Sequence, residues 1–166
     1  MTLQQTEYQQ ALSNFMSELS NNFDYAITLT VKNLKQQSYY SAKNGKTITH
    51  AKVADIANTF VHKLNQNLLK RCYRRRTKKF NSLIKIETNK KGDNKHIHIA
   101  IGKCTFTKDR VEQVLFNIIK HTDALDTQYV IENIYDKGWL NYISKRQHTN
   151  SDSVLFETSV VNYTKQ

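Results

Sequence analysis

The chain has 166 residues, of which 39% are hydrophobic, and its 25 Lys and Arg against 14 Asp and Glu give a formal net charge of +11. This length suits one domain, so we expect a single domain over residues 1–166. We expect no membrane span and no secretion signal, because no run of about 18 apolar residues and no signal-peptide pattern occurs. Cys72 and Cys104 form no C-x-x-C pair, which argues against a disulfide framework or a zinc knuckle and favours a reducing, cytoplasmic compartment.

The first half of the chain alternates helical and strand patterns. Apolar residues at helical spacing predict an amphipathic helix in the first twenty residues, ending near Asn21 and Asn22. Residues 25–32 alternate and are rich in β-branched side chains, which predicts a central strand with Thr28 and Thr30 on one face, where we expect them to support the sheet. A long helix is predicted over about 51–70 from its apolar face.

The second half begins with a basic segment at 71–79, followed by strand patterns at 81–88 and 95–102 around the turn-rich residues 89–94, which predict a hairpin. Thr107 or Asp109 can cap another helix. A strand over about 128–135, a short helix carrying Trp139 and Tyr142, and a possible edge strand at 154–161 complete the chain. This order predicts an α+β fold with an antiparallel, ferredoxin-like sheet of about five strands packed against helices.

The strand at 95–102 carries His96 and His98, whose side chains share one face because successive residues of a strand point to opposite sides. The hairpin folds Glu87 back beside them, and the alternation of Lys85 and Glu87 with Ile84 and Ile86 puts Glu87 on the histidine face. One carboxylate and two imidazoles leave coordination positions open, as a catalytic ion requires. We therefore predict a divalent metal site at Glu87, His96 and His98, suited to Mn²⁺ or Mg²⁺, with Zn²⁺, Co²⁺ or Ni²⁺ as possible occupants in vitro. Ordinary surface residues are the alternative interpretation.

A Tyr-x-x-Lys sequence follows near the C-terminal side. Tyr142 and Lys145 lie three residues apart, which brings them together on a helix. A neighbouring cation favours the ionised phenol, so the pair is a candidate activated nucleophile. The chain contains nine tyrosines, however, so a chance occurrence of this spacing is the competing interpretation.

The excess of positive charge favours a nucleic-acid partner, because cations attract phosphates and release their counterions. The densest group of cations is the candidate for contacts with a DNA backbone: Arg71, Arg74, Arg75, Arg76, Lys78 and Lys79. A solvated helix end explains the same residues without DNA.

Taken together, these motifs resemble the HUH endonuclease superfamily, named after two histidines separated by a bulky apolar residue, here His96-Ile97-His98. The resemblance covers about residues 25–146, with motifs in the order found in rolling-circle replication initiators of plasmids and small single-stranded DNA viruses: 27–33, then Glu87 with the histidine strand, then Tyr142 to Lys145. Only one tyrosine occupies the nicking motif, and no P-loop is present, so no helicase motor is expected in this polypeptide.

The resemblance implies a nickase of a prokaryotic plasmid or phage that attacks single-stranded or hairpin origin DNA with Tyr142, leaving a 5′-phosphotyrosine and a free 3′-hydroxyl. Host helicase and polymerase are then the implied partners, and Lys145 would stabilise negative charge. The alternatives are a single-tyrosine HUH transposase, a metal-dependent nuclease that activates water, and a non-catalytic nucleic-acid-binding module.

Overall fold

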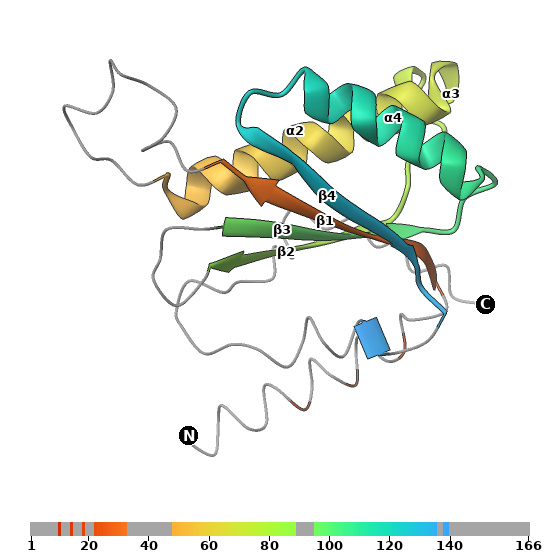
Figure 1. The fold of residues 1–166 in the computed structure, drawn as a ribbon. Helices are drawn as coiled ribbons and strands as arrows, with labels where there is room; N and C mark the ends of the chain where they lie inside the picture. Colours follow the sequence, from red (N-terminus) through yellow and green to blue (C-terminus); the bar gives the residue numbers. More distant parts are fainter. Residues whose placement is uncertain are drawn as a thin grey trace.

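The computed structural model describes residues 10, 14, 18, 22–32, 48–88, 95–135 and 138–139 (Figure 1). The elements in chain order are β1 (Phe23–Val31), α2 (His50–Leu69), α3 (Arg71–Arg74), β2 (Ser82–Thr88), β3 (Lys95–Gly102), α4 (Lys108–Lys120) and β4 (Leu125–Asn133). Gln10, Asn14 and Glu18 are also helical, in the segment where the sequence predicts the first helix.

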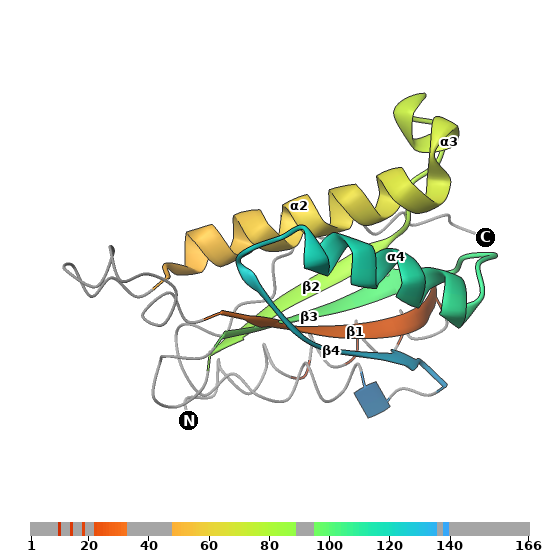
Figure 2. The same cartoon turned by 45° about the horizontal axis from the view of Figure 1, so that its top comes forward.

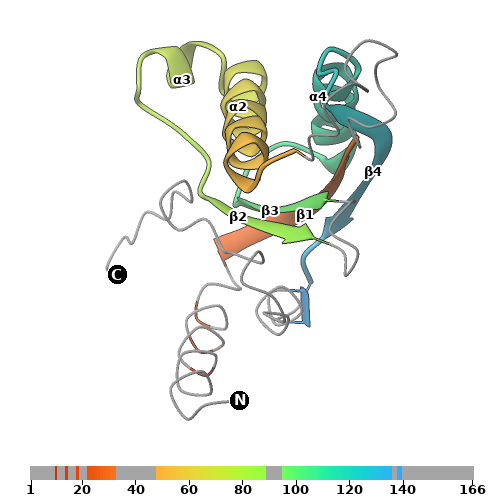
Figure 3. The ribbon, with the colours of Figure 1, turned by 90° about the vertical axis from the view of Figure 1, so that its left-hand side faces the viewer.

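The four strands form one antiparallel sheet in the order β2-β3-β1-β4, so β1 is central as predicted. Helices α2 and α4 both lie on one face of this sheet (Figures 2 and 3). The protein is thus an α+β fold. Apart from the short α3, its elements follow the order β-α-β-β-α-β, which is that of a split β-α-β arrangement. The hairpin turn at 89–94 and the expected edge strand at 154–161 lie outside the described residues.

The two main helices begin at threonine caps and bury one apolar face each. The Thr49 side chain accepts a hydrogen bond from the Lys52 amide at 3.2 Å, and Thr107 does the same for the Arg110 amide at 3.4 Å. Thr107 rather than Asp109 is therefore the cap of α4. The core between helices and sheet contains the fully buried residues Ile27, Leu29, Val53, Phe60, Leu64, Ile84, Ile86, Ile97, Ile99 and Leu115.

Two boundaries differ from the sequence prediction. Strand β4 begins at Leu125, three residues before the predicted start, because Leu125 pairs with Val31 and is buried although polar residues follow it. The helix at 51–70 ends at Leu69, where Lys70 has a positive φ of 45°, and the start of the basic segment forms the separate short helix α3. Among the described residues, no helix is long and apolar enough to cross a membrane.

Candidate metal centre

The face of the sheet opposite to α2 and α4 carries the residues predicted to bind metal. Ile27 and Leu29 of β1 pack in the core beneath the helices, so Thr28 and Thr30 point to the other face. The strand register arranges the residues of this face in rows across β2, β3 and β1. Glu87, His96 and Thr30 form one row, and Lys85, His98 and Thr28 form the next. The prediction that Glu87 shares a face with both histidines is consistent with this register.

Glu87 and His98 are in direct contact. Nε2 of His98 lies 3.0 Å from Oε2 of Glu87, on the diagonal between the two rows. The side chain of His98 is only 8% exposed and that of Glu87 only 20%, so the contact lies in a region largely screened from water. A hydrogen bond to a carboxylate is stronger there than at an exposed surface.

Two threonines of the central strand support the imidazoles from the other side. Thr28 Oγ1 lies 3.1 Å from Nδ1 of His98, and Thr30 Oγ1 lies 3.4 Å from Nδ1 of His96. The sequence prediction gave these threonines a supporting role in the sheet, whereas their hydroxyls contact the histidine rings. A hydroxyl can donate or accept, so it can hold either neutral form of an imidazole in place.

The surroundings favour the neutral imidazole at His98. Burial is the largest influence and lowers the pKa of His98 below its usual value, and the positive charge of Lys85 acts in the same direction. The hydrogen bond and the negative charge of Glu87 oppose this shift without cancelling it. Since a metal binds the unprotonated ring nitrogen, the lowered pKa favours the ligand form of His98.

His96 stands apart from the Glu87–His98 pair. Its ring centroid lies 6.5 Å from that of His98, with the ring planes inclined at 38°. Across the ranges 22–32, 48–88 and 95–135, no three His, Cys, Asp or Glu side chains are arranged so that they already form a metal site. The three predicted ligands are therefore brought to one face of the sheet without converging on one point.

The Glu87–His98 pair nevertheless has a spacing that suits a divalent ion. Two ligand atoms at right angles around an ion, each at about 2.1 Å, are roughly 3.0 Å apart. The observed Nε2 to Oε2 distance is 3.0 Å. A carboxylate oxygen and imidazole nitrogens are also a donor set that Mn²⁺ accepts. The donor types present suit a divalent ion, but the described residues bring only Glu87 and His98 together, and His96 does not join them.

The Tyr-x-x-Lys sequence lies outside the described part of the chain. Both residues that the sequence predicts to act there, Tyr142 and Lys145, are outside the described residues. The described segment 138–139, drawn in blue, is helical and lies on the side of the sheet opposite to α2 and α4 (Figures 2 and 3). This is the side that carries the histidines.

The predicted DNA-contacting cations occupy a different part of the molecule. They lie in α3 and the segment leading into β2, and all six are exposed: Arg71, Arg74, Arg75, Arg76, Lys78 and Lys79. Strand β2 separates this segment from Glu87, because Ser82 starts the strand and Glu87 lies near its other end. At roughly 3.3 Å per residue this is about 17 Å, too far for one phosphate to contact both groups.

Sequence reasoning did not assign roles to two further residues. Lys85 was placed on the histidine face by alternation, but its 1% exposure beside His98 depends on packing. Lys103, in the connection between β3 and α4, lines the same cleft as the basic segment only in the folded chain. No local pattern marks either residue, because their neighbours are distant in the sequence.

Comparisons of the chain with protein-family models, with curated proteins and with solved structures found no match. The candidate site therefore stands on its own residues and their geometry.

Proposed function

We propose that this protein is a metal-dependent DNA nickase of the HUH type that initiates rolling-circle replication. The observation that carries the proposal is the 3.0 Å contact between Nε2 of His98 and Oε2 of Glu87, with His96 paired to Glu87 across the strands on the same face of the sheet. The α+β architecture with an antiparallel sheet agrees with the HUH fold, and the positive net charge of +11 agrees with a DNA substrate.

In this proposal, Glu87, His96 and His98 hold the ion, and Thr28 and Thr30 orient the two imidazoles through their Nδ1 atoms. The bound ion supplies Lewis acidity at a nonbridging phosphate oxygen. The hydrogen bond of His98 to Glu87 would hold two of the donor atoms in place on the sheet before the ion binds.

Tyr142 is the proposed nucleophile. Its phenolate oxygen forms a bond to phosphorus while the bond from phosphorus to the 3′-oxygen breaks, and this oxygen takes a proton to become a free 3′-hydroxyl. The product strand is joined to the protein as a 5′-phosphotyrosine. Lys145 stabilises the negative charge of the phenolate before attack. The described segment 138–139, only a few residues before Tyr142, lies on the histidine side of the sheet, which supports this pairing of motifs.

The substrate is proposed to be single-stranded DNA, or a hairpin with an unpaired nick site. A phosphate in a rigid duplex is held away from a side chain on a short helix, whereas an unpaired strand can bend into a site on the sheet. The free 3′-hydroxyl can then prime synthesis, and the phosphotyrosine keeps the bond energy needed for later resealing.

The test is the formation of a covalent protein–DNA adduct. A pool of end-labelled, random-sequence single strands is incubated with the full chain and Mn²⁺, and the products are separated on a denaturing gel. We expect an adduct with the native chain and with the control Tyr135→Phe, because Tyr135 is 87% exposed and lies outside the proposed motif. We expect none with Tyr142→Phe or with His98→Ala. Sequencing the attached strand then identifies the nick site.

Two outcomes would overturn the proposal. Cleavage that persists in Tyr142→Phe and leaves no protein-linked product would indicate a nuclease that activates water. Retention of single strands by the native chain without any cleavage in Mn²⁺ or Mg²⁺ would indicate a binding module without catalysis.

A further inference from the structure

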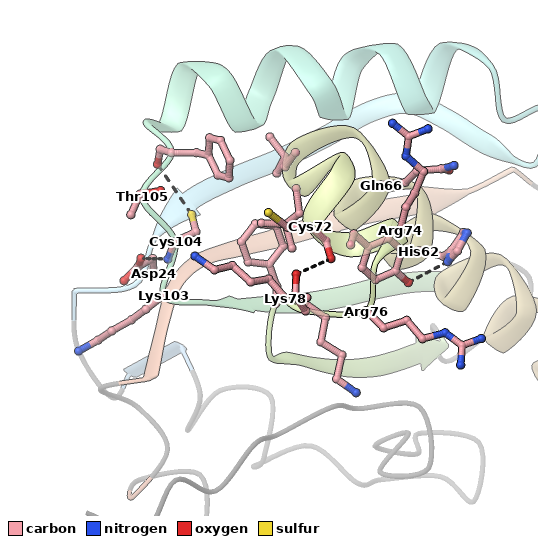
Figure 4. Close-up of a pocket in the computed structure, with 17 residues that line it drawn as sticks. Asp24, His62, Gln66, Cys72, Arg74, Arg76, Lys78, Lys103, Cys104 and Thr105 are labelled. Atoms are coloured by element: carbon pink, nitrogen blue, oxygen red, sulfur yellow. Dashed lines mark hydrogen bonds between the residues drawn. The ribbon is translucent and has the colours of Figure 1, made fainter.

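A cleft lies at the other end of the sheet from the candidate metal centre, beside the helices. Its walls come from the C-terminal part of α2, from α3 and the segment that follows it, and from the connection between β3 and α4 (Figure 4). The cleft has a volume of about 1190 Å³. Ligand pockets usually span about 300 to 1,000 Å³, so this cleft is large enough for a nucleotide segment.

The rim of the cleft is strongly basic. Five exposed cations line it: Arg74, Arg76, Lys78, Lys79 and Lys103. None of them makes a salt bridge with a residue in the described ranges, where the His98–Glu87 contact is the single pair found. The acidic residue of the lining is Asp24. Its carboxylate accepts a hydrogen bond from the Cys104 amide at 2.9 Å and so holds the connection between β3 and α4. The cleft therefore favours an anionic ligand.

The interior of the cleft is apolar and aromatic. Phe80 and Phe106 meet edge to face, with ring centroids 6.2 Å apart. Tyr73 also lines the cleft and is half-buried, and its hydroxyl is hydrogen-bonded to Nδ1 of His62 at 2.8 Å. Asn65 holds the Phe80 amide through its Oδ1 at 2.7 Å, which anchors this wall to α2. The interior is thus built by side chains that have fixed partners.

We propose that this cleft binds a segment of single-stranded DNA, with backbone phosphates on the cationic rim and an unstacked base against the aromatic interior. A duplex keeps its base faces stacked and covered, so it would leave the apolar interior unused. A cationic groove combined with aromatic surfaces is the arrangement that single strands require. Lys103 adds one exposed cation, from the connection between β3 and α4, to those of the segment at 71–79.

The cleft is separate from the candidate metal centre. It borders Asp24 at the start of β1, whereas Thr30 and the Glu87–His96 row lie near the other end of that strand. At roughly 3.3 Å per residue, the stretch from Asp24 to Thr30 measures about 20 Å. The inference rests on the proposed function only in taking DNA as the ligand, and it requires no metal.

The test measures binding of a labelled oligothymidine to the full chain by fluorescence anisotropy in EDTA, over a series of salt concentrations. The variant is Lys78→Ala with Lys103→Ala. The matched control, Lys52→Ala with Lys120→Ala, removes the same charge from exposed residues elsewhere on the surface. Each lost phosphate contact lowers the slope of log affinity against log salt by about 0.7 for single strands, so we expect a decrease of about 1.4 in the variant. The control slope should stay near that of the native chain.

A second comparison tests the base contact. Tyr73→Ala should weaken oligothymidine binding roughly fivefold or more, because stacking of a base on an aromatic ring is lost, whereas Tyr73→Phe should bind nearly as the native chain does. The proposal is overturned if the cleft variant and the surface control lose affinity equally, or if a blunt duplex of the same length binds as tightly and competes fully. A chain that binds in EDTA through the cleft but forms no adduct with Mn²⁺ would contradict the nickase and leave this inference standing.

Discussion

The hydroxyl of Thr28 and the imidazole of His98 are neighbours across β1 and β3, with Oγ1 of the threonine 3.1 Å from Nδ1 of the histidine. Because Nε2 of the same ring faces Glu87, it donates its hydrogen to the carboxylate when the ring is neutral, and Nδ1 then accepts from Thr28. A metal at Nε2 requires the proton on Nδ1 instead, and Thr28 can accept it without moving. The threonine thus accommodates both tautomers of His98.

Replacing Thr28 by Val keeps the shape of the side chain and removes this hydroxyl. We expect Mn²⁺ affinity to fall by about 10- to 100-fold, the usual effect of losing a hydrogen-bond partner of a metal-bound histidine. Thr28→Ser retains the hydroxyl and should bind Mn²⁺ almost as the native chain does. Isothermal titration calorimetry measures both variants, and equal affinity for Val and Ser would show that the hydroxyl does not orient His98.

Glu87→Gln removes the negative charge of the candidate ligand with little change in size. We expect loss of Mn²⁺ binding of at least about tenfold, together with loss of adduct formation, because a neutral amide is a poorer ligand for a hard cation. Glu132→Gln on the exposed edge strand β4 removes the same charge elsewhere and should leave both measurements unchanged. Electron paramagnetic resonance of free Mn²⁺ gives the affinities, and a similar loss in both variants would point to a general effect of charge.

Asn65 connects α2 to the segment entering β2. Its side chain is 3% exposed, with Oδ1 accepting from the Phe80 amide at 2.7 Å and Nδ2 donating to the Val61 carbonyl at 2.9 Å. Asn65→Leu leaves the buried Phe80 amide without its partner, which should lower the free energy of unfolding by about 1–3 kcal/mol.

Asn67 provides the matched control for this substitution. It makes the same helical contact, from Nδ2 to the Lys63 carbonyl at 2.8 Å, but it is exposed. Asn67→Leu should change the free energy of unfolding by less than about 0.5 kcal/mol. Urea unfolding followed by circular dichroism compares the two, and equal effects would mean that the Phe80 contact contributes nothing.

Phe60 and Phe116 offer a comparison of two phenylalanines in different surroundings. Phe60 of α2 is 1% exposed within the core, and Phe116 of α4 is 53% exposed. Phe60→Ala should reduce the free energy of unfolding by about 3–5 kcal/mol, since it leaves a cavity as well as losing apolar contacts. Phe116→Ala should cost less than about 1 kcal/mol. Thermal or chemical unfolding distinguishes these outcomes, and a large loss in Phe116→Ala would indicate that a partner surface covers it.

The two cysteines should differ in reactivity. Burial is the main cause that raises the pKa of the Cys104 thiol, so its reactive thiolate forms at a higher pH than that of an ordinary cysteine. Cys72 is exposed in α3. Iodoacetamide should therefore modify Cys72 before Cys104, as mass spectrometry of timed samples can follow. Simultaneous modification would show that the region around Cys104 opens readily.

Much of the candidate site follows from local periodicity that can be read in the chain. Alternation in a strand places every second side chain on the same face, so His96 and His98, and Glu87 in the preceding strand, could be assigned to one surface of a hairpin. The faces of α2 and α4 and the central position of β1 were also predictable. The physical reason is that strand and helix geometry relate residues only a few positions apart.

The decisive distances arise from contacts between residues far apart in the chain. The approach of Glu87 to His98 along the diagonal depends on the register of the hairpin, and the contact of Thr28 with His98 depends on the pairing of β1 with β3. The early start of β4 at Leu125 and the meeting of Lys103 with the basic segment likewise follow from packing. Only the folded chain establishes these neighbours, because no local preference determines which strands pair or in which register they pair.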